Sequence, residues 1–131
     1  MQYLAVIVAT LAAYGFGAFW YIRMSTRWIK AAGIPVDAAG KPQGSGSPMP
    51  FVVGFICILL VAGMMRHVFI MSGLDTLVEG LMGGFGIGAF LITPWVVMNY
   101  TYSARPRALM LIDGTYSVVG CTIMGIVLTL F

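Results

Sequence analysis

Four long runs of hydrophobic residues, separated by polar stretches, dominate the chain. They cover residues 3–22, 51–72, 76–102 and 108–131. Each run is about the 20 residues that an α-helix needs to cross the hydrocarbon core of a bilayer. The connection 23–50 is the only long polar stretch; it predicts an interfacial helix through Ala32 and then a Gly-, Pro- and Ser-rich loop. The pattern predicts an all-α integral membrane protein, a single domain (1–131) of four transmembrane helices in a bundle.

Composition supports this prediction, because 60% of the residues are hydrophobic, only 8% are charged and the mean hydropathy is +0.98. A water-soluble domain is about one-quarter charged, so this chain has too few polar side chains to cover a soluble globule. The net charge of +3 is therefore interpreted as a topology signal, and nucleic acid is not an expected partner. Cys57 and Cys121 lie far apart within hydrophobic runs, and each is interpreted as a small buried hydrophobe.

Basic residues predict the orientation of the four spans. Cytoplasmic loops of membrane proteins carry an excess of Lys and Arg. The first and third connections, which share one side of the membrane, hold Arg23, Arg27, Lys30, Lys41, Arg105 and Arg107. We therefore expect these connections in the cytoplasm and both termini on the non-cytoplasmic side, in a multi-pass protein of the bacterial inner membrane. The first run precedes its basic residues, unlike a cleavable signal peptide.

Small residues recur at every fourth position in three of the spans. They are Gly80, Gly84 and Gly88; Ala9, Ala13 and Gly17; and Ser117, Cys121 and Gly125. A glycine-rich phosphate loop needs a preceding strand and an aqueous site, which a membrane span excludes. Small residues let helix backbones approach closely in lipid. These stripes predict helix-packing surfaces, either within one chain or between two copies.

Two charged residues lie inside the predicted second and third spans. Folding these spans about Ser72 and Gly73 places Arg66 level with Glu79, each six or seven residues from the turn. That is about 10 Å from the membrane surface at 1.5 Å per residue. A charge at mid-membrane costs about 2.5–3.5 kcal/mol, so we expect an Arg66–Glu79 ion pair. The alternative is a site for an anionic lipid or substrate beneath the outer surface.

A second polar level lies near the cytoplasmic boundary. Folding the third and fourth spans about Pro106 places Asn99 level with Asp113, and a hydrogen bond between them would be worth about 0.6–2 kcal/mol. Asp113 and Tyr116 share one helical face, which predicts a small polar pocket open to the cytoplasm. The alternative is an ion pair of Asp113 with Arg23, Arg105 or Arg107.

His67 gives the only indication of metal chemistry. Met64, His67 and Met71 recur on one face of the second span, and thioether and imidazole groups suit Cu(I). Ten methionines in a hydrophobic chain also align by chance, so we expect no metal and no cofactor, with His67 an interfacial side chain beside Arg66. The chain has no nucleophile–base arrangement and is not expected to be an enzyme.

Several short motifs resemble one protein family. They are the N-terminal "YLAVIVATLAAYGFGAFWY", the later Trp28, "MNYTYSARP" and "LIDGTYSVVGCTIMGIVL". Together they resemble the bacterial membrane family called domain of unknown function 1761, over nearly the whole chain. The most specific parts are Trp20-Tyr21, Asn99-Tyr100, Arg105-Pro106 and Asp113 with Tyr116. The family pattern often has a Ser-Pro or Gly-Pro turn after the Trp-Tyr pair, where this chain has Ile22-Arg23-Met24. The resemblance implies a four-helix membrane protein with no assigned activity.

Three functions are compatible with the sequence. We expect a non-enzymatic protein that assembles by helix packing, as a homo-oligomer or as an accessory subunit of a membrane complex. The first alternative is a dimeric transporter of a lipid or small molecule, with Asp113 or Glu79 coupling it to protons. The second is lipid or soft-metal binding within the membrane. Membrane lipid is an expected partner in each case.

Overall fold

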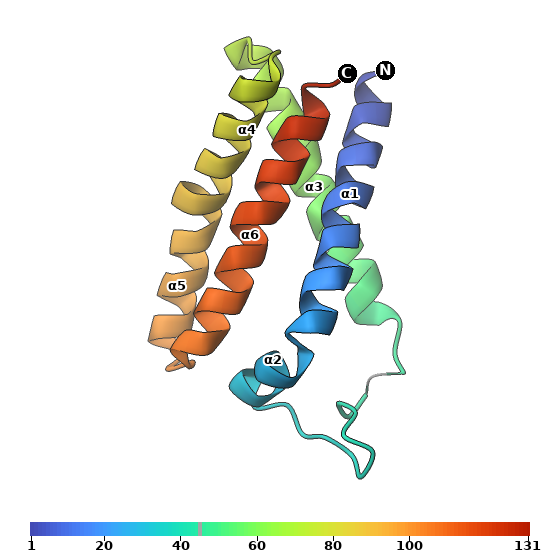
Figure 1. Ribbon diagram of the computed structural model, residues 1–131, viewed down its shortest axis with the longest axis vertical. Coiled ribbons are helices and arrows are strands. Elements are labelled where there is room, and N and C mark those ends of the chain that lie inside the picture. The colour runs from blue at the N-terminus through green and yellow to red at the C-terminus, as the bar shows by residue number, and fades with distance from the viewer. Residues whose placement is uncertain (45) are drawn as a thin grey trace.

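The chain folds into a bundle of helices in a computed structural model that describes residues 1–44 and 46–131 (Figure 1). The elements are α1 (Gln2–Arg23), α2 (Ser25–Ala32), α3 (Met49–Ser72), α4 (Leu77–Gly86), the π-helix η1 (Ile87–Ile92), α5 (Thr93–Tyr102) and α6 (Arg107–Leu128). Elements α4, η1 and α5 follow one another without a break, so the bundle has four helices long and apolar enough to cross a membrane. The predicted all-α class and four spans are confirmed.

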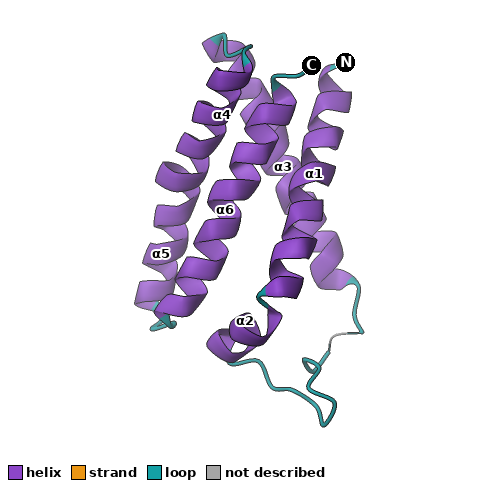
Figure 2. Ribbon diagram, viewed as in Figure 1, coloured by secondary structure: helices purple, strands orange, loops and turns teal. Residues whose placement is uncertain are grey.

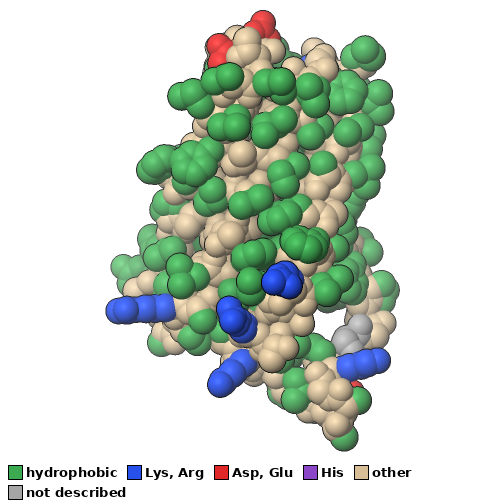
Figure 3. Space-filling model, in the orientation of Figure 1, with side chains coloured by type: hydrophobic (Ala, Val, Ile, Leu, Met, Phe, Trp, Pro, Cys, Tyr) green, Lys and Arg blue, Asp and Glu red, His purple; other side chains and the backbone are tan. Residues whose placement is uncertain are grey.

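The two ends of the bundle differ in charge and in structure. Both termini lie at one end, whereas α2 and the described loop residues 33–44 and 46–48 lie at the other (Figures 1 and 2). Most blue basic side chains in view gather at the α2 end, and the most prominent red acidic group lies at the opposite end, with hydrophobic side chains covering the length between them (Figure 3). We call the end that carries α2 the basic end. The predicted interfacial helix is α2, and one antiparallel bridge, Val36–Pro42, closes the loop that follows.

The turn between α3 and α4 is fixed by local chemistry. Gly73 ends α3 with a φ of 68°, in the left-handed region that glycine adopts without strain. Thr76 begins α4 by accepting a hydrogen bond from the Glu79 amide at 3.3 Å, and the Glu79 carboxylate accepts from the amides of Asp75 and Thr76 at 3.1 and 3.0 Å. This reciprocal capping box gives Glu79 a structural partner at the helix start.

The π-helix lies just before the proline of the third span. Pro94 has no N–H, and its ring crowds the carbonyl one turn earlier. The wider turn of η1 accommodates the ring, and the Thr93 hydroxyl donates a hydrogen bond to the Gly88 carbonyl at 2.7 Å. A side chain thus satisfies a backbone oxygen where water is absent.

Helix α6 lies at the centre and contacts every other helix (Figure 1). Its small residues meet those of the third span within one chain. A methyl group added at Gly84 would collide with the Cys121 carbonyl, and one at Gly88 would lie 2.7 Å from the Ser117 carbonyl oxygen. The predicted stripe is therefore the α4–α6 contact, and it is occupied inside the chain.

Helix α1 packs by the same principle. Ala5, Ala9 and Ala13 are fully buried where α1 contacts α3 and α6. Gly17 continues this face, and a methyl group there would lie 2.8 Å from the Tyr116 ring. Small residues bring the helices together along most of α1, and they give way to aromatic rings towards the basic end.

Candidate functional site

Asp113 is the centre of a hydrogen-bonded cluster near the basic end. Its Oδ1 accepts from the Tyr21 hydroxyl at 2.6 Å and from the Trp28 indole N–H at 3.0 Å, and its Oδ2 accepts from the Tyr100 hydroxyl at 2.6 Å. The donors come from α1, α2 and α5, and the half-buried carboxylate from α6. We call these four residues the Asp113 cluster. Three uncharged donors therefore satisfy both oxygens of the Asp113 side chain.

Two further hydrogen bonds support the cluster. The Trp20 indole N–H donates to the Ile112 carbonyl at 3.0 Å, next to Asp113, which fixes α1 to α6. The Arg105 guanidinium donates to the Ala32 carbonyl at 2.6 Å, at the end of α2. Helix α2 is therefore held at its middle by Trp28 and at its end by Arg105.

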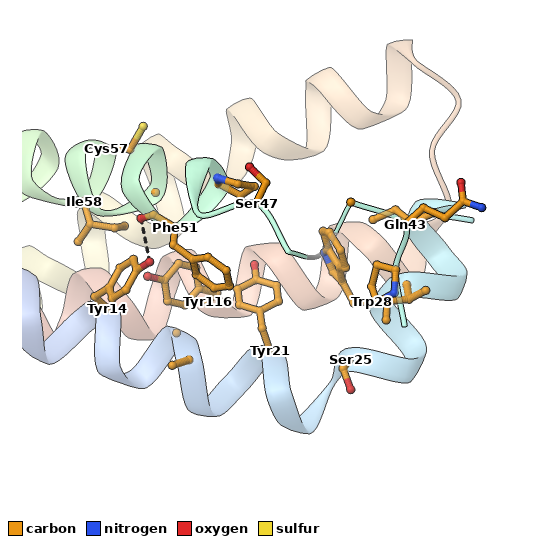
Figure 4. Close-up of a pocket in the computed structure, with 18 residues that line it drawn as sticks. Tyr14, Tyr21, Ser25, Trp28, Gln43, Ser47, Phe51, Cys57, Ile58 and Tyr116 are labelled. Atoms are coloured by element: carbon orange, nitrogen blue, oxygen red, sulfur yellow. Dashed lines mark hydrogen bonds between the residues drawn. The ribbon is translucent and has the colours of Figure 1, made fainter. Parts of the chain in front are cut away.

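An apolar pocket of about 700 Å³ lies beside the cluster (Figure 4). Its walls come from α1, α2, α3, α6 and the loop 33–48, and include Tyr14, Gly17, Tyr21, Trp28, Gln43, Ser47, Phe51, Gly54, Cys57 and Tyr116. Figure 4 shows the rings of Tyr14, Phe51 and Tyr116 converging between the helices. The Tyr14 hydroxyl donates to the Phe51 carbonyl at 2.8 Å. A ligand pocket is commonly of this size and mostly apolar, with a few polar groups.

The cluster and the pocket share two side chains. Tyr21 and Trp28 line the pocket and also donate to Asp113. Their rings pack edge to face at 6.0 Å, and Tyr21 packs against Tyr116 at 5.4 Å. Asp113 lies behind this aromatic wall, and its hydrogen bonds hold Tyr21 and Trp28 in position.

Several sequence expectations differ from these contacts. The predicted partner of Asp113, Asn99, is exposed, and its neighbour Tyr100 makes the bond. Arg23, Arg105 and Arg107 form no ion pair with Asp113 in the described part of the chain. The predicted polar pocket is instead a mostly apolar one: Tyr116 is in its wall, with its hydroxyl donating to the Ala13 carbonyl at 3.3 Å, and Asp113 is behind it.

The predicted ion pair between Arg66 and Glu79 is not formed. Glu79 caps α4, and the Arg66 guanidinium donates to the Leu128 carbonyl at 2.5 Å. Arg66 is half-buried, and its Nε is buried without a hydrogen-bond partner among the described residues. A cation near the last carbonyls of a helix is favourable, so Arg66 serves as a cap for the end of α6.

The candidate soft-metal residues lie on the outer surface of α3. Met64 and Met71 are 62% and 74% exposed, and His67 is also exposed. Within residues 1–44 and 46–131, no three His, Cys, Asp or Glu side chains are grouped so as to hold a metal ion. These side chains face outward where a membrane protein meets lipid tails.

The fold is that of a multi-pass helical membrane protein. It has four helices long and apolar enough to cross a membrane, a hydrophobic lateral surface and charged ends. The model of the family described as "Protein of unknown function (DUF1761)" matches residues 4–129. The chain belongs to this family, as the resemblance predicted. Searches of curated proteins and of solved structures found no match.

The cluster includes three residues that sequence reasoning did not choose as site candidates: Tyr21, Trp28 and Tyr100. A signal for them was present, because all three lie in the motifs that carry the family resemblance. Those motifs are far apart in the chain, at 20–21, 28, 99–100, 105–106, 113 and 116. Hydrogen bonds and aromatic contacts bring residues from each of them to the basic end.

Proposed function

We propose that this protein is a non-enzymatic membrane protein that binds an apolar molecule with a small polar group in the pocket at its basic end. The observation that carries the proposal is the pocket itself, in which two lining side chains, Tyr21 and Trp28, are held by the Asp113 carboxylate. We therefore favour binding of a lipid or small molecule over assembly by helix packing, because Gly80, Gly84 and Gly88 already pack against α6 of the same chain.

The lining of the pocket supports this class of ligand. Tyr, Phe and Trp rings offer large apolar contact at low entropic cost, while Gln43 and Ser47 of the loop supply polar groups. Small residues leave the space open, since Gly17 and Gly54 occupy positions where a side chain would enter it. The ligand is expected to lay its apolar part among the rings and its polar group towards the loop.

A substitution at Gly54 tests the proposal. A methyl group there would lie 3.7 Å from the Tyr14 ring, an ordinary contact, so Gly54→Leu should fill the pocket while keeping the fold. Gly63→Leu on the same helix is the matched control, because nothing lies within 4 Å of an added methyl there. With palmitate carrying a photoreactive diazirine as the probe, we expect cross-links concentrated on Tyr21, Tyr116 and Phe51.

Gly54→Leu should reduce those cross-links about tenfold, the effect of losing about 1.4 kcal/mol of binding, and Gly63→Leu should leave them unchanged. Mass spectrometry of the labelled peptides provides the measurement. Labelling spread over outward side chains such as Leu60 and Phe90, and insensitive to Gly54→Leu, would exclude the pocket as the binding site.

We also propose that the basic end faces the cytoplasm of a bacterium, with both termini on the other side, in line with the positive-inside rule. A single cysteine replacing Lys41, in a chain with Cys57 and Cys121 changed to Ala, should resist a membrane-impermeant maleimide in intact spheroplasts. A cysteine replacing Asp75 should react at once. Labelling at position 41 and protection at position 75 would show that the basic end lies on the non-cytoplasmic side.

Self-association or a larger membrane complex stays a prediction. The three stripes of small residues face inward, so an interface with another chain would use outward side chains. Proton-coupled transport likewise stays an alternative, in which Asp113 would bind the proton.

A further inference from the structure

A second concave site lies on the other side of α2. This groove of about 580 Å³ runs between α2 and the start of α6. It is lined by Trp20, Met24, Arg27, Lys30, Ala31, Pro106, Ala108, Leu111, Ile112 and Thr115. Along α2, residues 25, 28 and 29 line the pocket, whereas residues 27, 30 and 31, with Met24 just before the helix, line the groove. The two sites are therefore separate.

The groove combines two cations with an apolar wall. Arg27 and Lys30 are exposed on its α2 side. Trp20, Leu111 and Ile112 form the opposite side, and Leu111 is 71% exposed. The Trp20 indole N–H is already bonded to the Ile112 carbonyl, which orients the ring as part of the wall.

Within the described residues, no acidic side chain forms an ion pair with either cation. The sequence has four acidic residues. Asp75 and Glu79 lie at the opposite end of the bundle, Asp37 accepts from the amides of Ala39 and Lys41 within the loop, and Asp113 is bonded by its cluster. Arg27 and Lys30 are therefore available to an anionic group of another molecule.

We propose that the groove binds an anionic phospholipid. Its phosphate lies between Arg27 and Lys30, and one acyl chain runs along Trp20, Leu111 and Ile112. The two positive charges favour an anionic headgroup. The position of α2, where the apolar lateral surface ends and the basic side chains begin, allows the acyl chain of the same lipid to lie against the apolar surface (Figure 3). Basic clusters on interfacial helices attract anionic lipid in this way. This inference holds whether or not the pocket on the other face of α2 binds a ligand.

Native mass spectrometry of the full chain, titrated with phosphatidylglycerol or with phosphatidylcholine of identical acyl chains, tests the proposal. The wild type should retain phosphatidylglycerol preferentially. Arg27→Gln/Lys30→Gln should lower that preference about 25-fold, at about fivefold for each basic residue. The control Arg23→Gln/Lys41→Gln removes the same charge outside the groove and should retain most of the preference. Both variants change exposed side chains, so their melting temperatures should match that of the wild type.

The competing outcomes are distinct. Equal loss in the two double variants would show a diffuse charge effect and overturn the groove. Full displacement of phosphatidylglycerol by its water-soluble headgroup, glycerophosphoglycerol, at equal concentration would show an anion site without an acyl chain and overturn the lipid. An unchanged affinity for phosphatidylglycerol itself after Leu111→Ala/Ile112→Ala would remove the apolar wall from the proposal, because that wall contacts the acyl chain and not the headgroup.

Discussion

Gly84→Leu is expected to disrupt the bundle. The added side chain would collide with the backbone carbonyl of Cys121, and neither backbone can move without opening the α4–α6 contact along its length. Overpacking a core costs about 1–3 kcal/mol or more, and we expect at least the upper end here because the obstacle is backbone. Loss of helical circular dichroism during titration with sodium dodecyl sulfate provides the measurement.

Gly86→Leu is the control for this substitution. It lies two residues further along the same helix, and nothing lies within 4 Å of a methyl group added there. Leucine is also a better helix former than glycine, by about 1 kcal/mol at most, so this variant should be as stable as the wild type or slightly more stable. Equal stability of the Gly84 and Gly86 variants would contradict the packing described for α4 and α6.

Asp113→Leu is expected to loosen α2, because α2 loses the Trp28 hydrogen bond and keeps the one between Arg105 and the Ala32 carbonyl. It removes the acceptor of three hydrogen bonds, each worth about 0.6–1.7 kcal/mol between membrane helices, or about 2–5 kcal/mol together. Arg27 and Lys30 lie within α2, so a loosened α2 becomes a better substrate for trypsin. We expect rapid cleavage there in the variant and slow cleavage in the wild type, measured by gel electrophoresis over time.

Two milder variants separate the roles of the cluster. Asp113→Asn keeps one carbonyl acceptor for Tyr21 and Trp28, and its amide can donate to the Tyr100 hydroxyl, so its effect should be smaller. Trp28→Phe removes only the hydrogen bond from α2 to Asp113, and it should speed cleavage while the four spanning helices keep their stability. If Asp113→Leu were as resistant to trypsin as the wild type, the carboxylate would not be what holds α2.

The spans were predictable from the sequence because bilayer thickness sets their length. The level of Asp113 was predictable too, since counting residues from a turn gives height along a helix. Counting does not give the direction in which a side chain points, and one residue rotates it by about 100°. This is why Asn99 was expected and Tyr100 is found. The π-helix η1 in the same span also changes the direction in which the later side chains point, because its wider turn departs from the α-helical repeat.

Arg66 shows a second limit. A comparison of two adjacent spans places Glu79 beside it, but the end of α6 offers a carbonyl at the same level. The pocket was hidden for a related reason: its walls come from four helices and the loop 33–48, and no local pattern records which aromatic rings of distant segments share a space.

The central position of α6 has a consequence for biogenesis. The spanning helices before α6 are made first, yet α6 is the most buried span. In its most apolar stretch 39% of the residues are buried, against 11–28% in the other three spans. The earlier spans therefore enter the bilayer with their small-residue faces open to lipid or to a chaperone. Final assembly begins when the ribosome has released the helix that all of them contact.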